Sequence, residues 1–255
     1  MRLYYLISFL ICSLLTLGHA QDTATNNFYK EISKYDLSVL WVGDSVKESK
    51  NKNFKRPEPI GFIGDSFQRF YIHFISIAIN PQRPYEYNVY GKTKIKNNIR
   101  SIHGTITVKS ADTVRMAGND RIERLMGWVV CNILFYEDKK QPASGFIKGR
   151  FESNFYFDKE GILRYDDLDI EADDYSNNQF VGTWTGYKTI KSKKCNWGDY
   201  RIPECGDLDT GAGAFIPNKK YLKFGWDSHT NAWDFDPDKP ETKQPGLKEK
   251  QQWWK

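Results

Sequence analysis

The feature that most constrains the fold is a two-residue alternation in residues 85–109. Between positions 85 and 96 the odd residues read Y, Y, V, G, T and I, and the even residues read E, N, Y, K, K and K. This period is typical of a β-strand with one buried and one solvated face. The pair Asn97-Asn98 then predicts a two-residue hairpin turn, because asparagine tolerates the positive φ that such turns require.

The predicted turn also defines a register for the two strands of the hairpin. With the turn at the asparagine pair, Val89 lies across from Ile106 on the apolar face. On the polar face, Glu86 lies across from Lys109. A slip of one residue would move every apolar side chain to the solvated face, so the side-chain pattern disfavours it.

A second hairpin is predicted around the sequence K-E-G at positions 159–161. Glycine at the third position suits the left-handed residue of a three-residue hairpin loop. This loop places Leu163 across from Phe157 and Tyr165 across from Phe155.

Several further segments have strand patterns and are separated by turn residues. They are Leu37–Trp41, Phe67–Ile79, Ile122–Tyr136, 146–157 and Gln179–Ile190. With the two hairpins the chain has at least seven predicted strands, and no amphipathic pattern of helical length accompanies them. The sequence therefore predicts an all-β fold, an antiparallel β-barrel or β-sandwich, with the barrel favoured.

The first 20 residues have the pattern of a secretory signal peptide. Arg2 precedes a nearly uninterrupted apolar run over residues 3–17, and the sequence G-H-A ends at Ala20 with small residues at the cleavage positions. The run is about 15 residues long, which is shorter than the ~20 that a membrane-spanning helix needs. We therefore expect an exported protein, secreted or periplasmic, with no integral membrane segment after cleavage.

The rest of the chain is predicted to form one all-β domain over residues 21–235 and a polar tail over 236–255. The tail is rich in Pro, Lys and Gln. The net charge of +5 comes from basic residues interleaved with acids, so no nucleic-acid partner is expected. A mean hydropathy of −0.64 argues against a polytopic membrane protein. The oligomeric state is left open.

Cys195 and Cys205 are predicted to form a disulfide. They flank a polar, turn-rich segment, and the predicted export places them in an oxidising compartment. The alternative is a metal site that includes His229, but zinc sites usually show paired short spacings. Cys131 lies in an apolar strand segment and is expected to be a buried thiol.

Acidic residues are the candidates for cation binding or hydrolysis. Residues 166–174 read DDLDIEADD, and Asp207 and Asp209 precede a glycine-rich loop. An EF-hand loop beginning at Asp167 would need glycine at position 172 and an acid at position 178, which are Ala and Asn. The sequence thus predicts no metal ion or cofactor, and it leaves open whether either acidic segment binds a cation.

Trp184 is the residue whose spacing suggests a binding site. It stands between Gly182 and Gly186 on one face of the segment 180–190. Its indole therefore has room to lie flat, either across the glycines or against a ligand.

No sequence pattern specifies a reaction, so whether the protein is an enzyme is left open. Gly-x-Ser-x-Gly, the HExxH motif and a phosphate-binding glycine loop are all missing from the sequence. The leading hypothesis is a secreted, non-enzymatic β-barrel binding module for a small molecule, a glycan or another protein. The alternatives are a secreted hydrolase that uses a carboxylate pair from the acidic segments, and a structural or assembly protein of the cell envelope.

Overall fold

The computed structural model describes residues 26–43, 45–47, 53–117, 121–232 and 238–255. The predicted signal peptide, residues 1–20, lies outside the described residues, so export stays a prediction. Among the described residues, no helix combines the length and the apolar character needed to span a bilayer.

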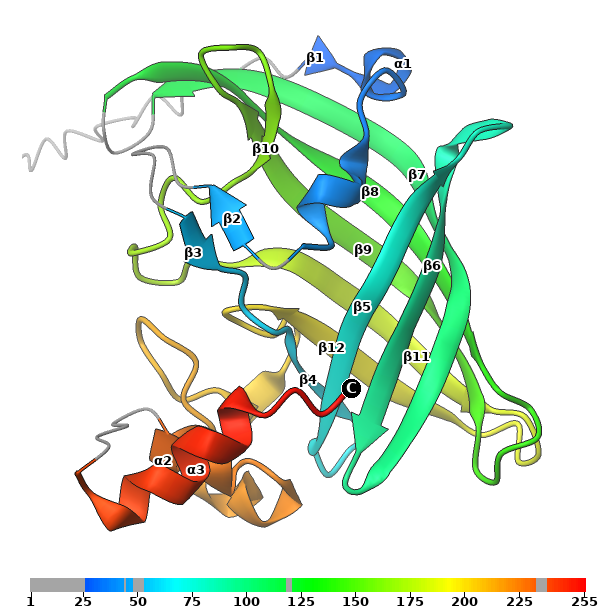
Figure 1. Ribbon diagram of the computed structural model, residues 1–255, viewed down its shortest axis with the longest axis vertical. Coiled ribbons are helices and arrows are strands. Elements are labelled where there is room, and N and C mark those ends of the chain that lie inside the picture. Colours follow the sequence, from blue (N-terminus) through cyan, green and yellow to red (C-terminus); the bar gives the residue numbers. More distant parts are fainter. Residues whose placement is uncertain (1–25, 44, 48–52, 118–120, 233–237) are drawn as a thin grey trace, which may run out of the picture.

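Antiparallel β-sheet dominates the described chain and confirms the all-β prediction (Figure 1). The strands of the main sheet are β1 (Asn26–Asn27), β4 (Ile60–Ile63), β5 (Gln68–Asn80), β6 (Arg83–Ile95), β7 (Asn98–Ala117), β8 (Glu123–Glu137), β9 (Gly145–Phe157), β10 (Leu163–Tyr165), β11 (Asn177–Gly186) and β12 (Ser192–Asp199). A separate ribbon pairs β2 (Ser45–Lys47) with β3 (Asn53–Lys55). The helices are α1 (Tyr29–Ile32), η1 (Leu37–Leu40), η2 (Gly206–Leu208), η3 (Lys219–Phe224), α2 (Asp227–Ala232) and α3 (Pro240–Lys250).

The strand pairings of the main sheet return to their starting point. Each strand from β4 to β9 pairs with the next, β9 pairs with β11, β11 with β12, and β12 with β4. However, β4 has four residues whereas β7 has 20, so the ring is uneven and a regular closed barrel is not confirmed.

The β6–β7 hairpin forms, but the predicted register is wrong. Val89 lies across from Gly104, two residues before the predicted partner Ile106, and Glu86 lies across from Thr107. The turn residues are 96 and 97, and Lys96 itself adopts the positive φ of 54°. A shift of two residues keeps every side chain on its predicted face, so the alternation cannot distinguish the two registers.

The β9–β10 hairpin has the predicted register. Leu163 pairs with Phe157 and Tyr165 pairs with Phe155. Gly161 has a φ of 73°, as expected for the left-handed position of the loop.

Residues Leu37–Trp41, predicted as a short strand, instead contain the 3-10 helix η1. The Asp36 side chain accepts a hydrogen bond from the Ser38 backbone N–H at 2.9 Å and so caps the helix. A capping carboxylate satisfies a backbone donor that would otherwise need a strand partner. The apolar pattern that suggested a strand serves here to bury one side of the helix.

The concave side of the sheet is filled by the larger of two apolar clusters, and α1 and η1 pack on this side (Figure 1). Phe135 and Phe151 are almost fully buried in this inner cluster, as are Leu40 and Trp41 from the N-terminal segment. Trp41 donates from Nε1 to Ser153 Oγ at 2.8 Å, which ties the segment to β9. A smaller outer cluster surrounds Phe62 of β4.

The predicted Cys195–Cys205 disulfide is not formed in the structure. Cys195 belongs to the inner cluster together with Ile63, whereas Cys205 packs against the outer cluster, which contains Phe62. Neighbouring residues of a strand point to opposite faces, so the two thiols lie on opposite sides of β4. A disulfide requires the two Cβ atoms to be about 4 Å apart, which this arrangement does not allow. Cys131 is fully buried, as predicted.

Residues 240–255, part of the predicted polar tail, fold onto the domain. Arg69 of β5 forms a bidentate salt bridge with Glu249 of α3, with hydrogen bonds of 2.8 and 2.6 Å. Trp253 is buried and contacts the ring of Tyr71 with centroids 5.9 Å apart. The C-terminal segment therefore lies beside β5 (Figure 1).

Candidate functional site

Four chain connections meet at one end of the sheet and surround a pocket. They are residues 64–67, 96–97, 138–144 and 187–191, which lie at the lower end of the molecule in Figure 1. Residues from or next to all four line a cavity of about 620 Å³, which we call the mouth pocket.

Trp184 lines the mouth pocket in a fixed orientation. Its Nε1 donates to Glu137 Oε2 at 3.1 Å. A Cβ atom on Gly145 would come within 2.8 Å of the indole, and one on Gly186 within 3.1 Å. The indole therefore packs against two glycines, of which the sequence identified Gly186 but not the cross-strand Gly145. The other flanking glycine, Gly182, lies against the ring of Phe180 and not against Trp184.

Glu137 is a buried carboxyl group that positions the tryptophan. Besides Trp184, the Thr93 hydroxyl donates to its Oε1 at 3.2 Å, and the Gly145 backbone N–H donates to its Oε2 at 2.8 Å. Burial raises the pKa of Glu137, and the three hydrogen bonds and the charge of Arg100 oppose that rise. Sequence parity does not single out this residue, because the preceding segment is apolar at both parities; the run of buried odd positions that Glu137 continues is visible only in the structure.

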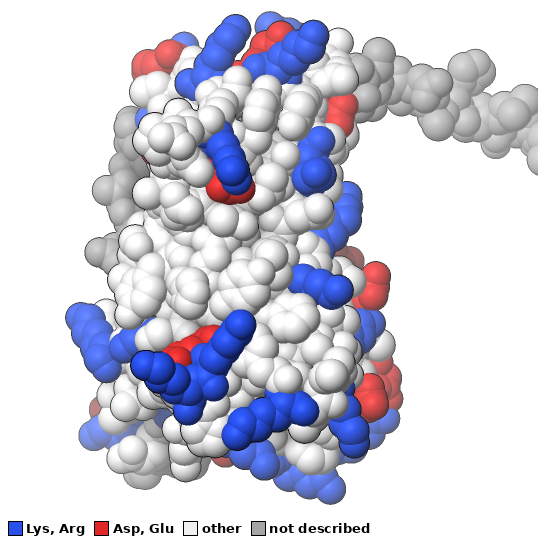
Figure 2. All heavy atoms as spheres, turned by 90° about the vertical axis from the view of Figure 1, so that its right-hand side faces the viewer, with Lys and Arg blue, Asp and Glu red and all other residues white. Residues whose placement is uncertain are grey.

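The four connections around the mouth pocket carry an excess of positive charge. The four connections contain two acidic residues, Asp65 and Asp138, against five lysines. The lysines are Lys96, Lys139, Lys140, Lys188 and Lys191. Lys193 of β12 adds a further positive charge, with Nζ 5.9 Å from the centroid of the Trp184 ring. Figure 2 shows Lys and Arg side chains gathered over the lower part of one face, toward this end of the molecule.

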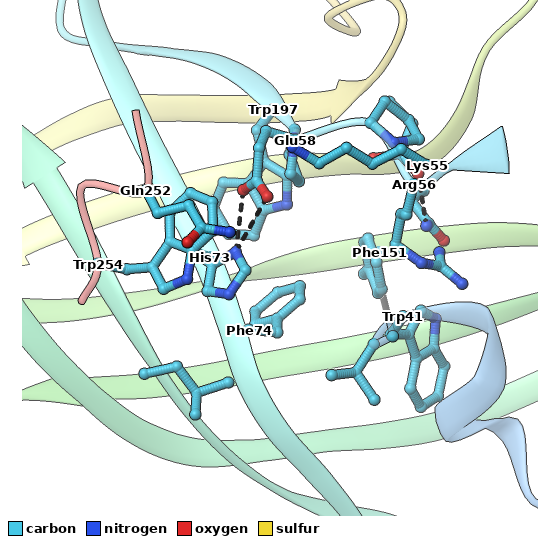
Figure 3. A pocket seen from close by; sticks show the side chains of 17 residues that line it. Trp41, Lys55, Arg56, Glu58, His73, Phe74, Phe151, Trp197, Gln252 and Trp254 are labelled. Carbon is cyan, nitrogen blue, oxygen red and sulfur yellow. Dashed lines mark hydrogen bonds and ion pairs between the residues drawn. The ribbon is translucent and has the colours of Figure 1, made fainter. Parts of the chain in front are cut away.

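A second cavity, of about 300 Å³, lies on the concave side of the sheet, and we call it the interior pocket (Figure 3). It exists because β4 pairs only with residues 68–71 of β5. Residues 55–59 and the C-terminal residues lie along the remaining part of β5 and, with the inner cluster, enclose the space. Its aromatic wall includes Trp41, Phe151 and Trp197.

Asp199 of β12 is a buried carboxyl group in the interior pocket. Its Oδ2 accepts hydrogen bonds from Tyr165 Oη at 3.0 Å and from Asn178 Nδ2 at 2.7 Å. Burial raises the pKa of Asp199 to about 6, although the charge of Arg56 and the two hydrogen bonds lower it. Nothing in the local sequence distinguished this aspartate, because its partners come from distant segments.

The outer side of the interior pocket is closed by stacked rings. His73 donates from Nδ1 to the Glu58 carboxylate, 3.0 Å from Oε2. The Trp254 indole stacks on the His73 ring, with centroids 3.8 Å apart and planes 13° apart. Figure 3 shows Trp254, His73 and Glu58 grouped on one side of the pocket, opposite Trp41.

Three of the acidic residues considered as candidates for cation binding or hydrolysis form ion pairs. Arg201 forms salt bridges with Asp174 at 2.5 Å and with Asp209 at 2.6 Å. Asp207 pairs with Lys220 at the surface. Among the described residues, no group of three or more His, Cys, Asp or Glu side chains is placed to hold a metal ion. Arg201 therefore joins the two acidic segments and compensates the charges of Asp174 and Asp209.

Comparison with known proteins provides no family assignment. No family model matches the chain, and no curated protein or solved structure is significantly similar to it.

Proposed function

We propose that the protein is an exported binding module, built as a small and uneven β-barrel, that holds a small anionic molecule in the mouth pocket. The observation that carries the proposal is the cavity of about 620 Å³ beside Trp184, with lysines around it. Ligand sites usually have volumes of about 300–1,000 Å³, and the mouth of a β-barrel is one of their preferred places. The strands act as a frame, and the four connections form the binding face.

Trp184 gives the ligand an aromatic surface that is already ordered. The hydrogen bond to Glu137 and the packing against Gly145 hold the indole before any ligand arrives. A preordered side chain loses little conformational entropy on binding, so more of the contact energy becomes affinity. An apolar or ring-shaped part of the ligand suits this surface.

The lysines determine the sign of the ligand charge. An excess of positive charge around a cavity raises the local concentration of anions and speeds their association. Because Lys193 lies over the Trp184 ring, an acidic group attached to a ring can contact the ammonium and the indole together. Carboxylated, sulfated or phosphorylated small molecules meet this description.

Glu137 supports a binding function more than an acid–base function. Both carboxylate oxygens already accept hydrogen bonds, from Thr93 on one side and from Trp184 and Gly145 on the other. A general acid or base needs a free path to the reacting proton.

The experiment is isothermal titration calorimetry with four anions: glucuronate, glucose 6-sulfate, citrate and inorganic phosphate. We expect one-to-one binding of at least one of them, weakened by added salt because exposed charges are screened. The double charge reversal Lys96→Glu with Lys193→Glu should weaken this binding at least about tenfold, or about 1.4 kcal/mol.

The matched control reverses two exposed lysines far from the mouth, Lys30→Glu and Lys109→Glu. This control has the same net charge as the rim variant. Equal losses of affinity in the two double variants would mean that overall charge, not the mouth pocket, attracts the anion. Absence of binding by all four anions would contradict the proposal.

A further inference from the structure

The interior pocket contains buried donors whose hydrogen-bonding capacity is not used. Within the described part of the chain, neither Trp197 Nε1 nor Arg56 Nε has a hydrogen-bond partner. Trp197 is fully buried, and both residues line the pocket. Buried polar groups in proteins are nearly always hydrogen-bonded, so these two donors indicate a ligand that accepts hydrogen bonds.

The same pocket also holds hydrogen-bond acceptors. The carboxyl groups of Asp199 and Glu58 both line it. Their formal negative charges are balanced by Lys55 and Arg56 of the same lining. Because these charges cancel, the lining favours neither an anionic nor a cationic ligand. A neutral ligand that both donates and accepts hydrogen bonds can pair with the Trp197 donor and with the carboxylate acceptors.

A hydroxyl group donates and accepts hydrogen bonds at one oxygen. Several hydroxyl groups on one ring can therefore accept from Trp197 and donate to Asp199 at the same time. The C–H faces of such a ring are apolar and suit the aromatic walls that Trp41 and Phe151 provide. The volume of about 300 Å³ is at the lower limit for ligand pockets, which suits one ring rather than a chain of rings.

We propose that the interior pocket is a second ligand site, which takes one neutral polyhydroxy ring, such as a monosaccharide or an inositol, beneath a cover formed by Trp254. The cover is held by stacking on His73, and Trp253 anchors the same segment against Tyr71. The ring lies between the inner cluster and this cover. The site shares no residue with the mouth pocket and differs from it in the charge of its ligand.

The test is isothermal titration calorimetry of the whole protein with glucose, mannose, N-acetylglucosamine and myo-inositol. At least one of these is expected to bind with one-to-one stoichiometry. Asp199→Asn removes a negative acceptor, and Trp197→Phe removes the unpaired donor while keeping a ring. Each should weaken the binding at least about tenfold. Trp254→Ala should weaken it severalfold, because the ring loses its outer wall.

The matched control is Trp226→Phe, which alters another fully buried tryptophan in the outer cluster, away from the pocket. Binding should remain unchanged in this variant, and thermal melting checks that all four variants fold. Failure of all four probes to bind would overturn the assignment. Unchanged binding in Asp199→Asn and Trp197→Phe would also overturn it. Unchanged binding in Trp254→Ala would show that Trp254 does not cover the ligand. The probes are uncharged, so these results are independent of the anion titrations at the mouth.

Discussion

Replacing the buried carboxylate Asp199→Asn tests the electrostatics of the interior pocket in detail. Asp199 is 1% exposed, and its Oδ2 accepts hydrogen bonds from Tyr165 and Asn178. The amide oxygen of asparagine can accept both of these bonds, so the substitution changes the charge while keeping the shape. Its effect on stability should therefore depend on pH.

The sign follows from the direction of the pKa change. Burial raises the pKa of Asp199 from 3.8 to about 6 in the folded protein. The folded state consequently binds the proton more tightly than the unfolded state. Below about pH 4 Asp199 is protonated, so the folded protein does not bear the free-energy cost of a buried charge. As the pH rises from about 4 through 6, that cost appears and the free energy of unfolding falls. Each pKa unit is worth about 1.4 kcal/mol, so the loss amounts to about 3 kcal/mol.

The assay is urea unfolding of wild-type and variant protein between pH 4 and pH 8. We expect the two proteins to have similar free energies of unfolding at pH 4. At pH 8 the Asp199→Asn variant should be more stable, by up to about 3 kcal/mol. The Asp138→Asn variant, which removes one exposed carboxylate, is the control for the loss of a negative charge at the surface. A difference for Asp199→Asn that does not change with pH would refute the reasoning.

Two further predictions concern the thiols and the close approach of strands β7 and β8. In the native protein a thiol reagent should label the partly exposed Cys205 and leave the buried Cys195 unlabelled. After unfolding without a reductant, both cysteines should react. Recovery of a linked peptide pair by mass spectrometry would contradict this. Gly104→Ala should lower the free energy of unfolding by about 1–3 kcal/mol, because the added Cβ would lie 2.0 Å from a carbonyl oxygen of β8. Denaturation showing an unchanged stability would mean that the strands have room to separate.

The strands were predictable because alternating or apolar segments of about ten residues are separated by turn residues. The segments predicted as Phe67–Ile79 and Ile122–Tyr136 agree with β5 and β8 to within one residue at each end. Alternation reports a register only to within two residues, however, and this is why Val89 has a different partner from the predicted one. The observed turn places Lys96 at positive φ, a conformation in which lysine is uncommon, so residue preferences did not predict it.

The sites were predictable only in part. The glycine spacing around Trp184 pointed to a tryptophan that now lines a pocket, although one of its two glycine contacts comes from the neighbouring strand. The interior pocket joins Glu58, Asp199 and Trp254, which are far apart in the sequence. No local pattern contains that information, since it arises from the short strand β4 and from the folding of the C-terminal segment against β5.

The most direct test of the mouth pocket as an anion site is the NMR signal of the Trp184 indole N–H. The signal can be assigned by its loss in Trp184→Phe and followed while glucuronate or glucose 6-sulfate is added. The account predicts a saturable shift of this signal that weakens with salt and is reduced by the Lys96→Glu and Lys193→Glu double variant. A Trp184 signal that stays fixed while either anion binds, with the shift appearing at another tryptophan, would contradict it.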